Sequence, residues 1–325
     1  MPEENKITRK PLIIIAGPTA SGKTSLSVRV AQAIGGEVIS ADSMQVYRHM
    51  DIGSAKVTEK ERQGIPHYLI DVLDPTDEFN VVVFQKMAKE AMETILSHGH
   101  IPILAGGTGF YIQALLYDID FTVTEEDSGY RDELAALALR EGPQALHRML
   151  KEVDPASAAA IHENNVKRMI RALEFHRSSG KRISEHNASE RQKESPYNFL
   201  YYVLTMDRAL LYDRINRRVD LMVQDGLLDE AKSFFSLPFA GTVRQAIGYK
   251  ELKPYFDGSL PLEEALDHLK METRRYAKRQ LTWFRRYASI HWLPIDRLSA
   301  QELLRESLRF IQNETGLCPG EGGTL

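Results

Sequence analysis

Residues 17–24, GPTASGKT, have the residue types and spacing of a loop that binds phosphate groups. The glycines let the backbone curl so that successive N–H groups point at phosphate oxygens, and the following helix adds about half a positive charge. Lys23 can reach an outer phosphate, and the Thr24 hydroxyl can bind Mg²⁺, the one cofactor we expect. The expected phosphate-binding residues are Gly17, Pro18, Thr19, Ala20, Ser21, Gly22, Lys23 and Thr24.

A second group with chemical potential is the carboxylate of Asp42, which follows an apolar run ending near Ser40. If this run is a strand of a parallel sheet, Asp42 lies at the carboxyl edge, where open α/β sheets place their ligands. A carboxylate there can accept a proton from a nucleophile. The alternative is an aspartate that caps a helix or closes a turn.

The stretch Gly106-Gly-Thr-Gly-Phe-Tyr111 also lies between an apolar run and a helical pattern. Its glycines permit close approach of the backbone to a ligand, and Thr108 can donate a hydrogen bond there. A purely structural turn between a strand and a helix is the alternative.

Paired arginines occur in residues 208–226, which have the pattern of an amphipathic helix. Arg214 and Arg218 are one turn apart, so their guanidinium groups can clamp a diphosphate. A solvated helix surface is the alternative.

Basic residues cluster twice, although the net charge of the 325-residue chain is −4. One cluster spans residues 167–182 and the other residues 267–290, and both have helical spacing with interleaved aromatic residues. Either cluster alone fits a solvated helix face, but two together favour contacts with a phosphate backbone.

The order of the elements predicts the fold. Apolar runs at residues 11–16, 37–40 and 101–105 alternate with helical patterns, which indicates a parallel α/β sheet. Residues 130–180 are wholly helical in pattern, a polar linker is expected over 185–196, and strand character returns at 197–205 and 290–295. We expect an α/β core from residues 1–122 and 197–313, a helical insertion at 123–196 and a flexible tail at 314–325.

Composition narrows the class of protein. With 43% hydrophobic and 26% charged residues, the chain is neither disordered nor collagen-like. The single cysteine excludes a disulfide framework, and no apolar run approaches the length of about 20 residues that spans a bilayer. We therefore expect a cytoplasmic protein with no membrane anchor.

Seven ordered motifs resemble those of the bacterial tRNA dimethylallyltransferases, and the resemblance covers about residues 11–295. The motifs are GPTASGKT, ADSMQVYRHMDIGSAKV, PHYLIDVLDP, IPILAGGTGFYIQALL, VKRMIRALE, RQAIGYKE and TRRYAKRQLTWFRR. The resemblance implies transfer of a dimethylallyl group from dimethylallyl diphosphate to N6 of adenosine 37, in the anticodon stem-loop of tRNA. It also implies a nucleotide-kinase-like phosphate-loop core with an all-helical, tRNA-binding insertion.

The resemblance assigns roles to residues by motif position. Asp42 matches the general base, Lys23 and Thr19 to Thr24 match the diphosphate site, and Arg218, with Arg214, matches an arginine that acts on the diphosphate. Thr108 joins Asp42, Lys23 and Arg218 in the catalytic set. The positions that match tRNA contacts are Asp42, Ser43, Met44, Gln45, Thr108, Arg131, Lys167, Arg168, Met169, Ile170, Arg171, Ile247, Gly248, Tyr249, Lys250, Glu251 and Leu252.

Two other functions compete with prenyl transfer. A small-molecule kinase would use the same loop for ATP and Asp42 as base toward a hydroxyl. The basic helices and the long C-terminal half speak against it, since a small acceptor needs neither. A non-catalytic RNA-binding module is less consistent with intact Lys23, Thr24 and Asp42. We expect a monomer that needs no obligate protein partner.

Overall fold

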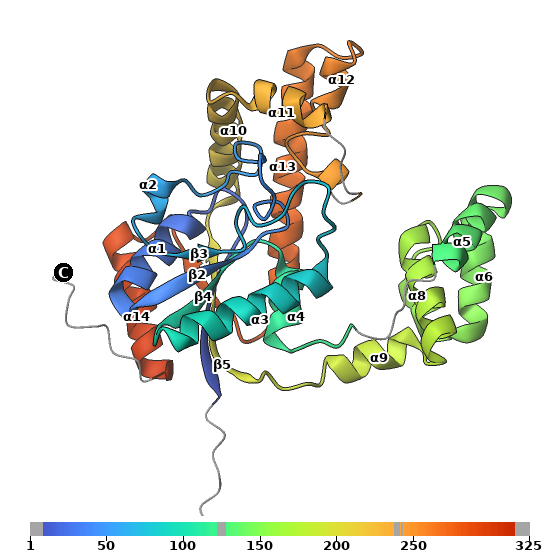
Figure 1. Ribbon diagram of the computed structural model, residues 1–325, viewed down its shortest axis with the longest axis horizontal. Helices are drawn as coiled ribbons and strands as arrows, with labels where there is room; N and C mark the ends of the chain where they lie inside the picture. Colours follow the sequence, from blue (N-terminus) through green and yellow to red (C-terminus); the bar gives the residue numbers. More distant parts are fainter. Residues whose placement is uncertain (1–8, 122–127, 237–240, 242, 316–325) are drawn as a thin grey trace, which may run out of the picture. The chain divides into compact units, whose positions relative to one another are not determined.

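The computed structural model describes residues 9–121, 128–236, 241 and 243–315 (Figure 1). The chain divides into two compact units. Unit 1 comprises Met1–Leu115 and Pro196–Leu325, and unit 2 comprises Leu116–Ser195. The boundaries expected from the sequence were after residues 122 and 196.

Unit 1 is built on a sheet whose strands all pair in parallel, as the alternating pattern predicted. Among the described residues the sheet has six strands in the order β3-β2-β4-β1-β5-β6. Their bounds are Lys10–Ala16 (β1), Gly36–Ala41 (β2), His67–Tyr68 (β3), Ile101–Gly106 (β4), Tyr197–Thr205 (β5) and His291–Pro294 (β6). An α/β architecture with a parallel sheet is therefore confirmed.

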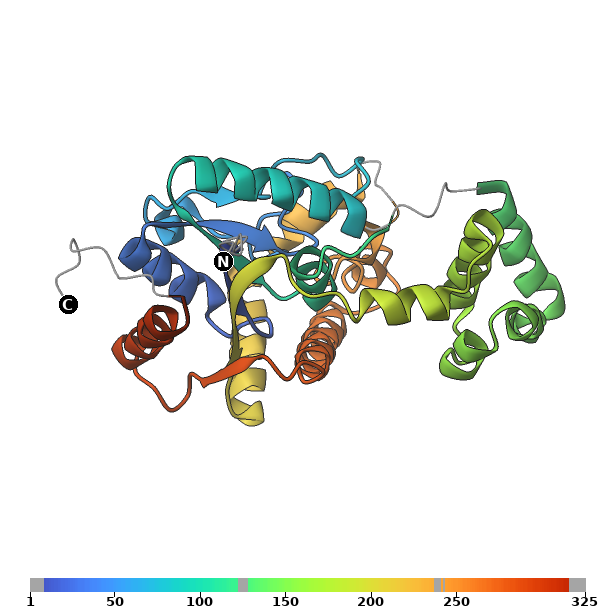
Figure 2. The same cartoon turned by 90° about the horizontal axis from the view of Figure 1, so that it is seen from below.

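The central strands are apolar throughout because helices cover both faces of the sheet. Residues 12–16 of β1 are fully buried. One face packs against α1 (Lys23–Ile34) and α14 (Ala300–Thr315), which contact each other. The other packs against α3 (Val81–Ser97), beside α4 (Gly109–Leu116), as Figure 2 shows.

Strand register brings three loops to one edge of the sheet. Ala16 of β1 and Ala41 of β2 both pair with Gly106 of β4, so the three strands end at the same level. The phosphate loop follows β1, Asp42 follows β2, and Gly107 follows β4. Parallel strands thus place these loops together at the carboxyl edge, as the sequence analysis expected.

The remaining helices of unit 1 lie in its C-terminal half, apart from the short α2 (Glu59–Arg62). Leu211 and Ile215 of α10 pack against Ala277 of α13, so these two long helices form one layer. The bounds of the helices in this half are Arg208–Gln224 (α10), Leu227–Phe235 (α11), Val243–Gln245 (the 3-10 turn η1), Lys253–Phe256 (α12) and Leu262–Phe284 (α13).

Unit 2 is helical throughout its described residues. Leu134, Leu146, Leu150, Met169 and Leu173 form its core. The helices are Ser128–Glu141 (α5), Pro143–Val153 (α6), Pro155–Ala160 (α7), Val166–Ser179 (α8) and Ile183–Glu190 (α9).

Two sequence expectations need correction. The polar stretch 185–196 was predicted to be a linker, but α9 continues to Glu190, whose buried carboxylate accepts a hydrogen bond from the N–H of Asp120 at 2.9 Å. This contact, distant in sequence, stabilises a helix that composition alone does not indicate. The tail was predicted to start at 314, but α14 extends to Thr315. The rest of that stretch, 316–325, lies outside the described residues.

None of the helices in the described part of the chain is both long and apolar enough to cross a bilayer.

The carboxylate of Asp154 ties three helices of unit 2 together. It is 1% exposed and accepts hydrogen bonds from the N–H and hydroxyl groups of Ser157 in α7 and of Ser184 in α9, at 2.7–3.0 Å. Burial opposes ionisation, but these four donors outweigh it and lower the pKa of Asp154 to about 2.

Replacement of Asp154 by asparagine should therefore destabilise the protein in a pH-dependent way. Because the folded pKa lies below the ordinary aspartate pKa of 3.8, the stabilisation is present above about pH 4 and is lost as the pH falls towards 2. Urea unfolding should show a difference of about 2 kcal/mol near pH 6 that shrinks over this range. A difference that does not vary with pH would contradict the role of the charge.

Candidate active site

A cavity of about 650 Å³ lies at the carboxyl edge of the sheet in unit 1. The segments that line it include the phosphate loop, the loop after β2, α10, residues 245–248 and α13. Among the lining residues, Lys23, Asp42, Arg218 and Tyr276 carry the groups best suited to chemistry. Residues far apart in sequence thus meet where the fold was expected to place a ligand.

The phosphate loop has the backbone that its glycines predicted. Gly22, with φ of 83°, lies in the left-handed region immediately before α1. The ammonium group of Lys23 donates to the carbonyl of Pro18 at 2.8 Å, which holds the lysine against its own loop. The first residues of α1, Lys23 and Thr24, line the cavity, so the N-terminus of this helix lies at its wall.

Two half-buried cations, Lys23 and Arg218, give the cavity positive charge. The pKa of Lys23 falls to about 8 because the ammonium is desolvated and because Arg218 is near, while Asp42 partly offsets this. The pKa of Arg218 is lowered as well, mainly by burial. Its guanidinium donates to the carbonyl of Ala55 at 3.5 Å. Like charges gathered in a buried site favour binding of a multiply charged anion.

Asp42 closes a turn and also faces the cavity. Its Oδ1 accepts hydrogen bonds from the N–H groups of Met44 at 2.8 Å and Gln45 at 3.3 Å. The turn role that the sequence left open is thus present together with the expected position beside Lys23. The pKa of Tyr276 rises to about 12, through burial and then through the charge of Asp42, so this hydroxyl stays protonated at neutral pH.

Gly106, at the end of β4, and Gly107, which follows it, are required by close packing within the protein. A Cβ on Gly106 would lie 2.2 Å from the carbonyl oxygen of Ala41, and one on Gly107 would lie 2.1 Å from the Gln280 amide. The N–H of Thr108 donates to the Ala41 carbonyl at 3.2 Å. The structural alternative for this motif therefore holds at Gly106 and Gly107.

Gln280 of α13 joins two of the loops and was missed by sequence reasoning. It is 6% exposed, accepts a hydrogen bond from the N–H of Thr19 at 2.9 Å and donates to the carbonyl of Gly107 at 3.0 Å. The only signal in the sequence for Gln280 was an uncharged polar residue within a strongly basic helical stretch.

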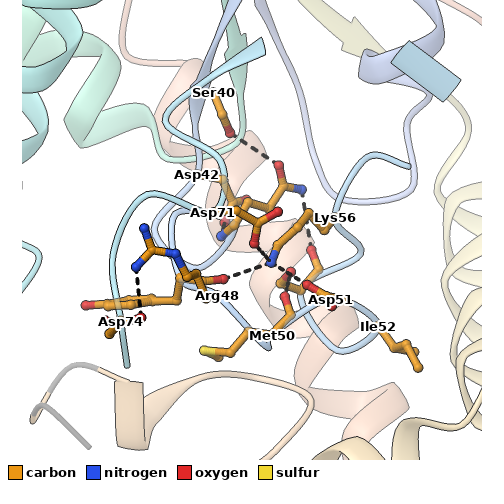
Figure 3. Close-up of polar contacts among 12 residues, drawn as sticks. Ser40, Asp42, Arg48, Met50, Asp51, Ile52, Lys56, Asp71 and Asp74 are labelled. Atoms are coloured by element: carbon orange, nitrogen blue, oxygen red, sulfur yellow. Dashed lines mark hydrogen bonds and ion pairs between the residues drawn. The ribbon is translucent and has the colours of Figure 1, made fainter. Parts of the chain in front are cut away.

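The loop of residues 42–57, here called the acceptor loop, is held by internal polar contacts (Figure 3). The side chain of Gln45 accepts from Ser40 and donates to the carbonyl of Ala55 at 3.1 Å. Lys56, with a side chain 6% exposed, donates to the carbonyl of Tyr47 and forms ion pairs with Asp51 and Asp71. This loop is therefore fixed although it has no regular secondary structure.

A carboxylate from α11 completes the support of the acceptor loop. Glu230 accepts hydrogen bonds from the N–H groups of Asp51, Ile52 and Gly53 at 2.8–3.1 Å, and from the hydroxyl of Tyr249 at 2.7 Å. Nothing in the local sequence marks Glu230, because its partners in the acceptor loop are about 180 residues away.

The predicted RNA-contacting stretches are only partly exposed. In unit 1, Ile247 and Gly248 line the cavity and Lys250 is exposed, but Tyr249, Glu251 and Leu252 are buried. The hydroxyl of Tyr249 donates to Glu230 in the interior of unit 1. A role in RNA binding stays a prediction for these three positions, whose side chains are buried.

Unit 2 shows the same division. Met169 and Ile170 pack into the core of unit 2, whereas Lys167 and Arg168 are exposed on α8 and Arg171 is half-buried. Arg131 donates through two nitrogens to the buried carboxylate of Glu174, at 2.8 and 2.9 Å. Because Met169 and Ile170 are buried, the cations at the start of α8 are the members of this predicted stretch whose side chains can reach an RNA.

Both predicted arginines of α10 line the cavity, and the structure adds Arg217 between them. Arg217 forms an ion pair with Asp213 at 3.0 Å.

For a hard divalent cation, Thr24 and Asp42 supply oxygen donors in the same cavity, so the residues present fit Mg²⁺.

A family model described as IPP transferase matches residues 45–287. The chain belongs to this family. It is 52% identical over 286 residues to the tRNA dimethylallyltransferase of Lachnoclostridium phytofermentans, covering 87% of this chain and 91% of the relative. The corresponding Bacillus subtilis protein is 48% identical over 294 residues, covering 89% and 93%.

Solved structures agree with this assignment. The tRNA isopentenylpyrophosphate transferase of Bacillus halodurans has a TM-score of 0.72 at 47% identity, with 94% of this chain and 97% of that chain covered. A eukaryotic dimethylallyltransferase captured acting on tRNA has a TM-score of 0.80 at 29% identity, with 96% and 81% covered. This chain therefore shares its fold with these two solved structures.

Replacing Glu230 with glutamine should lower turnover by roughly 10- to 100-fold, because a small displacement of the acceptor loop misplaces Asp42. The affinity for a diphosphate should change little, since the phosphate loop makes no contact with Glu230. Single-turnover kinetics and diphosphate titration measure the two effects. The matched control is Asp229→Asn, an exposed acid on the same helix, and equal effects in both variants would contradict the positioning role.

Proposed function

We propose that the chain transfers a dimethylallyl group from dimethylallyl diphosphate to N6 of adenosine 37 in tRNA and releases diphosphate. The observation that carries this proposal is the meeting of a phosphate loop, two half-buried cations and an aspartate around one cavity. Membership of the IPP transferase family and the names of relatives about 50% identical support the same reaction.

On the donor side, the phosphate loop binds the leaving group rather than a nucleotide. Negative charge grows on the diphosphate as the bond between C1 and oxygen breaks, and the N–H groups of the loop, Lys23 and Arg218 stabilise it. Arg214 lines the same wall of the cavity and adds a further positive charge. Because these groups are held in place before reaction, little reorganisation is needed in the transition state.

On the acceptor side, N6 of adenine is a weak nucleophile because its lone pair is delocalised into the ring. The base leaves its stack in the anticodon loop at a cost of a few kcal/mol, which contacts in the pocket offset. The Asp42 carboxylate then hydrogen-bonds to N6, orients it towards C1 and takes its proton as the new C–N bond forms. General-base assistance of this kind contributes about 10²–10⁴-fold.

Mg²⁺ is part of this proposal. Thr24 would hold the ion, which would supply positive charge that stabilises the leaving group. Thr24 lies in the first turn of α1, so its position is fixed by the helix.

The helical unit 2 would bind the anticodon stem-loop through the exposed Lys167 and Arg168 and the half-buried Arg171. Lys167, Arg168 and Arg171 follow one another along the first turns of α8. The polyanionic backbone of tRNA is the partner that such a cluster fits.

A direct assay separates prenyl transfer from phosphoryl transfer by a small-molecule kinase. Purified protein is incubated with bulk tRNA and either dimethylallyl diphosphate or ATP. We expect prenylated adenosine in the digested tRNA from the first mixture and no phosphoryl transfer in the second. Brisk transfer or hydrolysis of the γ-phosphate without any prenylation would overturn the proposal.

Asp42→Ala should lower turnover by at least about two orders of magnitude while retaining most of the affinity for tRNA. Single-turnover kinetics and a binding titration measure the two quantities. Asp42→Asn is the matched variant, because its amide oxygen can still accept the bond from Met44 but cannot take a proton. Near-normal turnover in Asp42→Asn would show that Asp42 does not act as the base and serves only to close the turn.

Neutralising Lys167, Arg168 and Arg171 together should weaken tRNA binding and flatten its salt dependence. Each lost phosphate contact lowers the slope of log affinity against log salt by about 0.7 to 0.9. The control neutralises three exposed cations on α5 and α6, namely Arg140, Arg148 and Lys151. An unchanged slope in the α8 variant would show that its cations form only a solvated face.

A further inference from the structure

A cluster of potential metal ligands lies outside the cavity, at the amino ends of two strands of unit 1. Glu37 is the second residue of β2, His98 caps the end of α3, and His100 directly precedes β4. One carboxylate oxygen, Oε1 of Glu37, lies 2.9 Å from Nδ1 of His98 and 2.6 Å from Nδ1 of His100. Three donor atoms from separate elements therefore converge on one point.

The backbone holds these three groups in place. Gly99, with φ of 74°, turns the chain tightly between the two histidines. The N–H of His98 bonds to the carbonyls of Thr94 and Ile95, and that of His100 to the carbonyl of Ile95 at 3.1 Å. Both imidazoles are thus directed to the same carboxylate by a closed turn.

The carboxylate itself is supported from behind. The side chain of Glu37 is 3% exposed, and its second oxygen, Oε2, accepts a hydrogen bond from the hydroxyl of Tyr68 in β3 at 2.6 Å. Carboxylates that ligate metals are commonly oriented by such a partner. The two imidazoles are each 47% exposed, so solvent reaches the cluster from one side.

We propose that Glu37, His98 and His100 bind one divalent transition-metal ion of the zinc class. Two imidazole nitrogens and one carboxylate oxygen suit Zn²⁺, whereas Mg²⁺ prefers oxygen ligands alone. Tetrahedral coordination at about 2.0–2.1 Å requires the nitrogens to lie about 3.3 Å from Oε1, so each imidazole withdraws by roughly half an ångström. Their exposure permits this movement, and water takes the fourth position.

The position of the site indicates a structural ion. Asp42 follows β2 at its other end, five residues from Glu37, which corresponds to roughly 17 Å along a strand. The ion would join β2, the turn before β4 and, through Tyr68, β3. It would stabilise the fold of unit 1 without taking part in the proposed prenyl transfer.

Zinc binding tests the proposal directly. The full-length protein without an affinity tag is titrated with Zn²⁺ against a chromophoric chelator, in an excess of Mg²⁺ that occupies the phosphate loop. We expect one ion per chain and a rise in the melting temperature. Substitution by Co²⁺ should give the visible absorption of a tetrahedral site.

Three variants make the assignment specific. The double variant His98→Gln, His100→Gln should bind Zn²⁺ at least tenfold more weakly, and Tyr68→Phe should bind it about tenfold more weakly. The control replaces two histidines of unit 2, His162 and His176, with glutamine and should bind as the unmodified protein does. Prenyl transfer should persist in the His98, His100 variant.

Two results would overturn the proposal. The first is the absence of saturable binding at one ion per chain, which would reduce the cluster to a hydrogen-bonded carboxylate. The second is equal affinity in the double variant and the control, which would place the ion elsewhere.

Discussion

The strand register at the carboxyl edge of the sheet is the constraint on which the rest of the structure depends. Because Ala16 and Ala41 both pair with Gly106, the three loops that follow these strands start at one level. A Cβ at Gly106 would collide with the backbone of Ala41, so the pairing and the glycine are inseparable. Lys23 and Asp42 owe their proximity to this edge, since each follows its strand within a few residues.

The sheet brings the phosphate loop and the acceptor loop close together, and contacts from the C-terminal half then hold them in place. Gln280 ties the phosphate loop to the Gly107 carbonyl, and Glu230 binds three successive N–H groups of the acceptor loop. These contacts satisfy backbone groups that include the carbonyl of Gly107, which would cost about 1–3 kcal/mol if it were buried without a partner. The site is therefore supported by helices that contribute few groups to the chemistry itself, which explains why so long a C-terminal half accompanies the phosphate loop.

Local signals accounted for the donor side of the site and much of the fold. The phosphate loop was predictable because glycine spacing, a buried strand and a helix start all lie within one short segment. The burial of residues within predicted contact stretches was not predictable, because Met169 of α8 and Tyr249, in a turn, are buried by contacts with parts of the chain that the motif itself does not show. Residues 185–190 were likewise assigned to a linker, since the buried Glu190 and its partner Asp120 are 70 residues apart.

The sequence by itself determined the parallel α/β class, the phosphate loop and the family, because these depend on short patterns of residue type and order. Only the tertiary structure decided which side chains face the cavity, that Asp42 both closes a turn and lines it, and that Glu37, His98 and His100 converge. Such facts rest on contacts across the sheet and between helices. Their geometry is set by packing and register, which local spacing along the chain does not encode.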